Sequence, residues 1–100
     1  MASLYITEFA AAGSANGQLP IAQFPEIGSH KLTIASTSNV SAAFDNATNF
    51  VRVHTDAICS IKSSTSTSAT ATSTNARMAL GQTEYFGVKP GTVIAVIVNT

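Results

Sequence analysis

The clearest structural signal in the chain is the segment Phe50-Val51-Arg52-Val53-His54-Thr55, which continues into Asp56-Ala57-Ile58-Cys59-Ser60-Ile61. Successive side chains of a strand point to opposite faces, so Val51 and Val53 share one face and Arg52 and His54 the other. The run Val93-Ile94-Ala95-Val96-Ile97-Val98 is apolar throughout, as in a central strand that is covered on both faces. We therefore predict a pair of strands at 50–56 and 58–61 and a buried strand at the C-terminus.

Strand signals recur along the chain, and no long window has the apolar spacing of a helix. The turn Lys89-Pro90-Gly91-Thr92 has the type II pattern, which predicts a positive φ at Gly91 and a hairpin between 85–88 and 93–98. Short strands separated by turn signals are typical of an antiparallel sandwich or a small barrel. We expect an all-β fold, a small antiparallel β-sandwich or jelly-roll-like domain. The strand segments are 4–9, 31–35, 40–44, 50–55, 57–61, 85–88 and 93–98.

Two segments do not have the pattern of a core. Residues 10–27 are rich in small and polar residues and contain Pro20 and Pro25, which predicts an extended arm or a long surface loop. Residues 63–75 are almost entirely Ser, Thr and Ala, which fits either a flexible linker or, as we favour, a long hairpin loop. The expected division is an N-terminal strand and extended arm over 1–28, and a sandwich body over 29–100 with a Ser/Thr/Ala-rich loop at 63–76.

The composition limits the partners of the chain. It has 100 residues, of which 10% are charged, with five basic and five acidic side chains and no net charge. Neither nucleic acid nor an acidic membrane is an expected partner of such a surface. A neutral surface suits a protein inside an assembly, although a plain neutral soluble domain is the alternative. No signal peptide is expected, and the longest apolar run is too short for a bilayer, so we expect synthesis in a cytoplasm.

No set of residues has the spacing of an active site. Cys59 is the single cysteine and is expected to be a buried free thiol. His30 and His54 lack the spacing of metal ligands and are expected on the polar faces of strands. The carboxylates are scattered, and the chain lacks a nucleophile elbow and a phosphate loop. We expect no catalytic, cofactor-binding or metal-binding residues, and a protein that is not an enzyme.

The N-terminal quarter carries the candidate interface residues. Aromatic and aliphatic side chains on an arm are plausible anchors in a groove of a neighbouring subunit or of a capsid. The alternative is that the first strip forms a strand within its own sandwich. The candidates are Leu4, Tyr5, Ile6, Phe9 and Phe24.

The order of these segments resembles a known group of proteins. The chain opens with Leu4-Tyr5-Ile6-Thr7-Glu8-Phe9, continues with the strands at 50–56 and 58–61, and closes with residues 77–92 and an apolar strand. It resembles small virion structural proteins of tailed bacteriophages, in particular head decoration, or cement, proteins. The resemblance covers nearly the whole chain, but its motifs are strand and turn patterns without a chemical signature.

The resemblance implies a non-enzymatic protein on the capsid surface of a virion, made in the host cytoplasm. Such a protein binds the major capsid protein, stabilises the head shell, and is often a homo-oligomer, a trimer or a dimer. The alternative from another class is a β-sandwich module of a phage fibre or surface appendage that binds a glycan or receptor. The absence of Trp and of an acidic cluster suited to Ca²⁺ disfavours that alternative.

Overall fold

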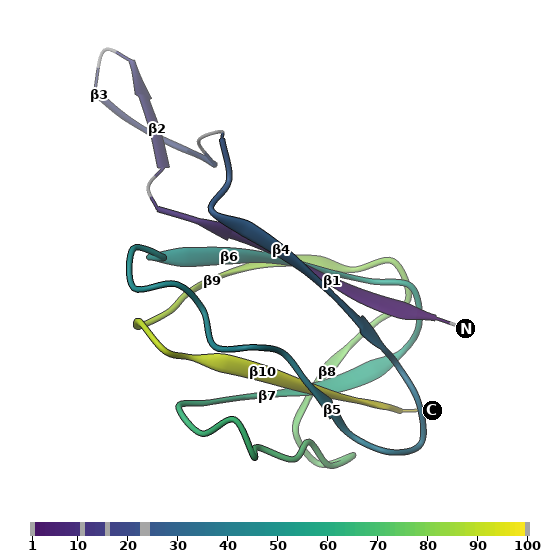
Figure 1. Ribbon diagram of the computed structural model, residues 1–100. Helices are drawn as coiled ribbons and strands as arrows, with labels where there is room; N and C mark the ends of the chain where they lie inside the picture. The colour runs from purple at the N-terminus through teal and green to yellow at the C-terminus, as the bar shows by residue number, and fades with distance from the viewer. Residues whose placement is uncertain (1, 11, 16, 23–24, 100) are drawn as a thin grey trace.

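The computed structural model describes residues 2–10, 12–15, 17–22 and 25–99, which form strands and no helix (Figure 1). The all-β prediction is therefore confirmed. The strands are β1 (Ser3–Phe9), β2 (Ala12–Ala15), β3 (Gly17–Ala22), β4 (Gly28–Thr33), β5 (Asn39–Val40), β6 (Phe50–Thr55), β7 (Cys59–Ser64), β8 (Ala76–Met78), β9 (Thr83–Gly87) and β10 (Val93–Val98).

Two antiparallel four-stranded sheets pack face to face, as Figure 1 shows. The first sheet has the order β4-β1-β6-β9, and the second has the order β5-β10-β7-β8. The sandwich architecture matches the prediction, and the alternating strands each turn their apolar face to the space between the sheets.

One predicted strand pairing is wrong. β9 and β10 lie in different sheets, so 85–88 and 93–98 do not form a hairpin; the successive strands β6 and β7 also lie in different sheets. The reason is that both members of each pair carry an apolar face, and placing them in opposite sheets buries both faces in one core. The turn itself is as predicted: Gly91 has φ 79°, and the Thr92 amide donates to the Lys89 carbonyl at 3.2 Å.

The core lies between the sheets. The alternation of the strands predicts a core of eight residues, Val51, Val53, Ile58, Ile61, Phe86, Val88, Ile94 and Val96. Of these, Val51, Val53, Ile61, Ile94 and Val96 are buried between the sheets. The prediction for Phe86 is wrong, since its side chain is 37% exposed at the edge of the first sheet; Ile58 and Val88 are half-buried. The buried cluster comprises Leu4, Ile6, Ile34, Phe44, Val51, Val53, Cys59, Ile61, Met78, Ile94 and Val96.

Cys59 is fully buried as a free thiol, as predicted. Burial raises the pKa of the Cys59 thiol, against the opposing effect of a hydrogen bond with the Thr55 hydroxyl at 3.4 Å. The thiol is therefore a packing group and poorly ionised.

The Ser/Thr/Ala-rich segment forms the predicted long hairpin loop between β7 and β8, which pair in the register Cys59↔Met78 and Ile61↔Ala76. This loop folds back along the outer side of the second sheet. The Ala71 amide donates to the Ser38 hydroxyl at 2.8 Å, and the Ser73 carbonyl accepts from the Asn99 side-chain amide at 3.2 Å. Ala71 is buried, and Val93 and Ala95, on the face of β10 that lies away from the core, are buried as well. The loop thus explains why both faces of β10 are apolar.

The N-terminal segment differs from the predicted division. β1 is an interior strand of the first sheet, paired with β4 on one side and β6 on the other, so it belongs to the body. The expected arm is the connection between β1 and β4. Its strands β2 and β3 pair with each other as a hairpin that projects from one end of the sandwich (Figure 1).

Candidate functional site

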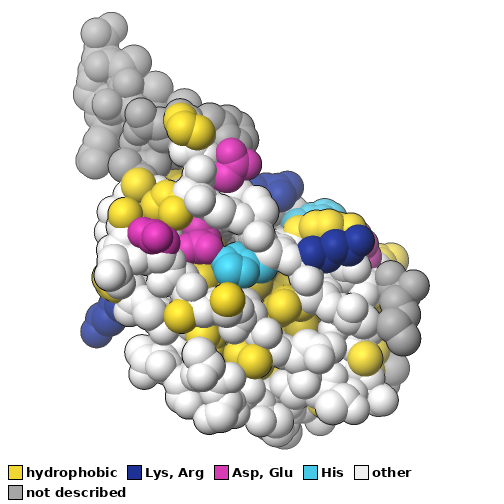
Figure 2. Space-filling model, in the orientation of Figure 1, with side chains coloured by type: hydrophobic (Ala, Val, Ile, Leu, Met, Phe, Trp, Pro, Cys, Tyr) yellow, Lys and Arg dark blue, Asp and Glu magenta, His cyan; other side chains and the backbone are white. Residues whose placement is uncertain are grey.

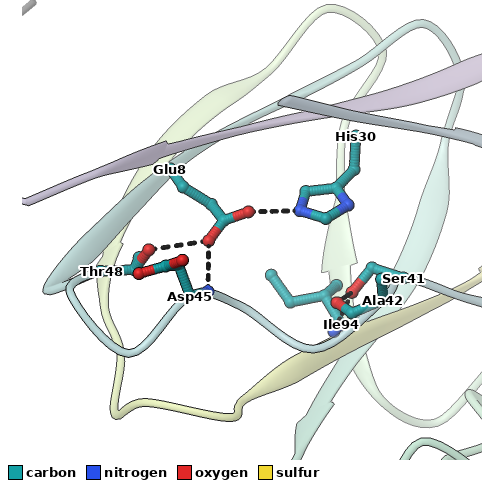
Figure 3. A network of polar contacts seen from close by, with 7 residues as sticks. All are labelled: Glu8, His30, Ser41, Ala42, Asp45, Thr48 and Ile94. Atoms are coloured by element: carbon teal, nitrogen blue, oxygen red, sulfur yellow. Dashed lines mark hydrogen bonds and ion pairs between the residues drawn. The ribbon is translucent and has the colours of Figure 1, made fainter. Parts of the chain in front are cut away.

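A buried carboxylate lies at the base of the projecting hairpin. Glu8 is the penultimate residue of β1 and faces inward with Leu4 and Ile6, and it is only 4% exposed. One carboxylate oxygen lies 2.5 Å from Nε2 of His30 on β4. The other accepts hydrogen bonds from the Asp45 amide at 2.8 Å and from the Thr48 hydroxyl at 2.7 Å. Figure 3 shows these groups converging on Glu8 from β4 and from the 45–48 turn.

The hydrogen bonds decide the ionisation of Glu8. Burial by itself raises the pKa of the carboxyl, but the bonds from Thr48, Asp45 and His30 outweigh it and hold the pKa below its ordinary value of 4.5. Both oxygens have partners, and no hydroxyl or thiol in the described part of the chain hydrogen-bonds to the other nitrogen of His30. The network therefore fastens β1, β4 and the 45–48 turn together.

An apolar pocket of about 270 Å³ opens between the two sheets. It lies where β9, at the edge of the first sheet, faces β7 and β8 of the second. Phe86, which was predicted in the core, forms part of the pocket wall instead. Lys89 is the only charged residue among the described residues that line the pocket. The lining residues are Ile61, Ser63, Ala76, Phe86, Gly87, Val88, Lys89, Thr92 and Ile94.

The outer face of the first sheet carries a row of aromatic rings. Phe9 on β1 stacks on Phe50 of β6 with ring centroids 5.2 Å apart, and Phe50 lies 6.4 Å from Tyr85 of β9. Tyr85 ends the row at the sheet edge and is 56% exposed. Farther along the same face, the Lys31 ammonium lies 5.7 Å from the ring centroid of Tyr5. This is the most aromatic exposed face in the described part of the chain.

His54 lies on this outer face, as predicted for it. Its Nδ1 shares a hydrogen bond with the Thr83 hydroxyl at 2.7 Å, while its Nε2 is 3.9 Å from the Asp56 carboxylate. That second distance exceeds hydrogen-bond length, so the carboxylate does not orient the ring as in a catalytic triad. The prediction for His30 is wrong: it faces inward, because the Glu8 carboxylate provides it with a partner there.

The candidate interface residues separate into two groups. Leu4, Ile6 and Phe9 are buried within the chain's own fold, at 0, 0 and 2% exposure. The apolar strip at 4–9 is therefore a strand of the chain's own sandwich, which is the alternative given in the sequence analysis. Tyr5 is 38% exposed and remains available to a partner. The candidate Phe24 lies outside the described residues.

The described ranges contain no group of three or more His, Cys, Asp or Glu side chains placed to hold a metal ion. Nor do they include a helix with the length and apolar character needed to cross a membrane.

Comparisons of the chain with family models, with curated protein sequences and with solved structures found no match.

Sequence reasoning missed the Glu8 network and the pocket. The alternation of β1 did contain a signal for the first, since Glu8 shares its strand face with Leu4 and Ile6, and a carboxylate at an inward position needs partners. The pocket had no such signal, because its walls come from four separate strands and turns.

Proposed function

We propose that the protein is a non-enzymatic structural protein of a tailed-phage virion, a capsid decoration or cement protein. In this role it binds the major capsid protein on the outside of the head, as a homo-oligomer, and stabilises the shell. The proposal carries forward the resemblance of the sequence to such proteins.

The observation that supports this proposal best is the projecting β2–β3 hairpin. A two-stranded hairpin is only marginally stable on its own in water and needs a third strand or a packing surface. In Figure 1 the hairpin stands away from both sheets of its own chain. A neighbouring subunit would provide the missing surface, and the Glu8 network fastens together β1 and β4, the two strands that the hairpin connects.

The surface chemistry supports the same role. Figure 2 shows a face that consists largely of uncharged groups, with few and scattered charged side chains. Exposed apolar side chains include Leu80 at 70%, Tyr85 at 56% and Val98 at 37%. Close contact with a shell then requires little desolvation of charge.

The test is binding to expanded heads of the encoding phage that lack the protein. The hairpin variant replaces residues 11–25 by Asn-Gly, which suits a two-residue turn closed by Ala10 and Glu26, the pair that continues the register of the antiparallel strands β1 and β4. We expect saturable binding of the parent chain in cosedimentation, and at least about tenfold weaker binding of the variant. Failure of the parent chain to bind heads overturns the proposed role. Equal binding by a folded hairpin variant overturns the role of the hairpin.

A second candidate is the glycan-binding or receptor-binding module. The exposed Tyr5 and Tyr85 on one sheet face favour it, because aromatic rings flanked by polar groups can stack on sugars. A glycan array with the parent chain and Tyr85→Ala distinguishes the candidates. Binding that Tyr85→Ala abolishes, without binding to heads, supports the module.

A further inference from the structure

β9 presents a free edge. The Val88 amide donates a hydrogen bond to the carbonyl of Asn49, which precedes β6. Asn49 and Val88 thus form a hydrogen-bonded pair, and so do Val51 with Phe86 and Val53 with Glu84, which lie two and four residues farther along the same register. Because hydrogen-bonded and non-bonded pairs alternate in an antiparallel ladder, the backbone groups of Thr83, Tyr85 and Gly87 point away from β6. No other strand pairs with β9 in the described structure. Three residues thus offer a backbone donor and acceptor each to a strand from outside.

The other edges of the two four-stranded sheets lack these features. β4 carries Lys31, a charge that discourages pairing, and its Thr33 carbonyl already accepts from the Asn39 side chain at 2.7 Å. β5 has two residues and β8 has three, too few for a stable pairing. β9 contains no Lys, Arg or Pro, and its register with β6 has no bulge. Its one charge, Glu84, accepts from the Gln82 side chain at 2.9 Å.

The residues of β9 also match a second copy of the same strand. A two-fold axis that passes through the centre of β9 pairs all five residues of the strand with those of a second copy. Tyr85 then lies opposite Tyr85 of the other copy, and Thr83 lies opposite Gly87. The outward backbone groups then face one another. Glu84 lies opposite Phe86, so the two carboxylates avoid each other. A shift by one residue toward the start of the strand would set Glu84 against Glu84, which like-charge repulsion disfavours.

The aromatic row extends across this axis. Phe9, Phe50 and Tyr85 lie side by side on the outer face, and the row stops at the exposed Tyr85 ring on the sheet edge. The ring of the second copy covers that exposed face. On the inner side, the added strand extends the sheet over the open side of the sandwich beside Phe86 and the pocket.

From this edge, register and aromatic row we infer that the chain forms a two-fold homodimer by antiparallel β9–β9 pairing. The dimer has one continuous eight-stranded sheet, made of the four-stranded sheets of two copies. The inference goes beyond the proposed function, since it concerns how two copies join and holds whether or not they bind a capsid.

A charge exchange at Tyr85 tests both the pairing and its register. Tyr85→Lys alone and Tyr85→Glu alone set like charges opposite each other across the axis, and each is expected to weaken dimerisation at least about tenfold in sedimentation equilibrium. An equal mixture of the two variants sets Lys opposite Glu and is expected to restore a heterodimer. Tyr85→Thr is the uncharged control, and it keeps a strand-forming residue at the site.

Three results would overturn the inference. They are a parent chain that is monomeric at millimolar concentration, folded single variants that dimerise like the Tyr85→Thr control, and a mixture that stays monomeric. A measurement on the parent chain guards against misfolded variants. In a mixture of differently isotope-labelled chains, contacts between Thr83 of one copy and Gly87 of the other are expected in NMR, and contacts confined to other strands contradict the pairing.

Discussion

Glu8 shows how one side chain can tie three parts of a fold together. Its carboxylate satisfies His30, the Asp45 amide and the Thr48 hydroxyl at once, in a place from which water is largely excluded. Hydrogen bonds to a charged group contribute more than neutral ones, about 1.5–3 kcal/mol. The same groups would be left without an acceptor if the carboxylate were removed, so the network is costly to break and specific in geometry.

We predict that Glu8 makes stability fall in acid. Because its folded pKa lies below 4.5, the ionised carboxylate stabilises the fold above about pH 4.5, and this contribution is lost as the pH falls through the folded pKa. Glu8→Gln is expected to lower the free energy of unfolding at pH 7 by about 1–3 kcal/mol and to flatten its decline in acid. Urea unfolding at several pH values measures both. The exposed Glu26→Gln is the control, and an equal acid decline in both variants contradicts the prediction.

Gly91 is held in a conformation that other residues resist. Its φ is 79°, and a Cβ built there meets no atom within 4 Å. Gly91→Ala is therefore expected to lower stability by about 1–2 kcal/mol through backbone strain alone, and Gly91→Asn by less. Gly87→Ala is the matched control, since Gly87 has no positive φ and its added Cβ would come no closer than 4.0 Å to the Asn49 carbonyl. Equal melting of the Gly91→Ala and Gly87→Ala variants would refute the strain argument.

At the scale of elements, the loop between β7 and β8 acts as a cover. Such Ser, Thr and Ala tracts are commonly linkers, yet here the backbone is fixed by Ser38 and Asn99, and the small side chains allow close approach to β10. The outer face of β10 in the second sheet is thereby shielded from solvent by a loop, without a third layer of helices or strands.

We predict that a charge at the buried position of this loop releases it. Ala71 is 1% exposed, so Ala71→Asp is expected to lower stability by about 1–3 kcal/mol, or to detach the loop if detachment is less unfavourable than burial of the carboxylate. Limited proteolysis within 65–75 and the unfolding free energy report the two outcomes. Thr70→Asp, at an exposed neighbour, is the control. Proteolysis and stability that match this control would show that the loop does not cover the sheet.

At the scale of the whole molecule, the body includes the first strand. We predict that a chain without residues 1–17 fails to fold, because β4 and β6 both lose the strand that lies between them. Replacing residues 11–25 by Asn-Gly is expected to leave the sandwich folded. Circular dichroism and the cooperativity of thermal unfolding compare the two. A cooperative transition in the shorter chain would show that β1 is dispensable.

Much of the fold could be predicted from the pattern of residues, and the site could not. The alternation at 50–55 and the apolar run at 93–98 predicted strands that the structure contains, and the Pro90-Gly91 pair predicted the turn. The residue pattern could not predict which strands pair. An apolar strand face can be buried in the core whether the next strand along the chain lies in the same sheet or in the opposite sheet. The inward turn of His30 depended on Glu8, which lies 22 residues away.

The sequence by itself determined that the chain is all-β, that its last strand is apolar on both faces, and that Cys59 is a buried thiol. These properties follow from local periodicity and composition, which act over a few residues. Only the tertiary structure decided that β1 lies in the interior of a sheet, that the 65–75 loop covers β10, and that β9 is left with a free edge. Those properties depend on which strands come together in space, and pairing energies are shared among residues that are far apart in the chain.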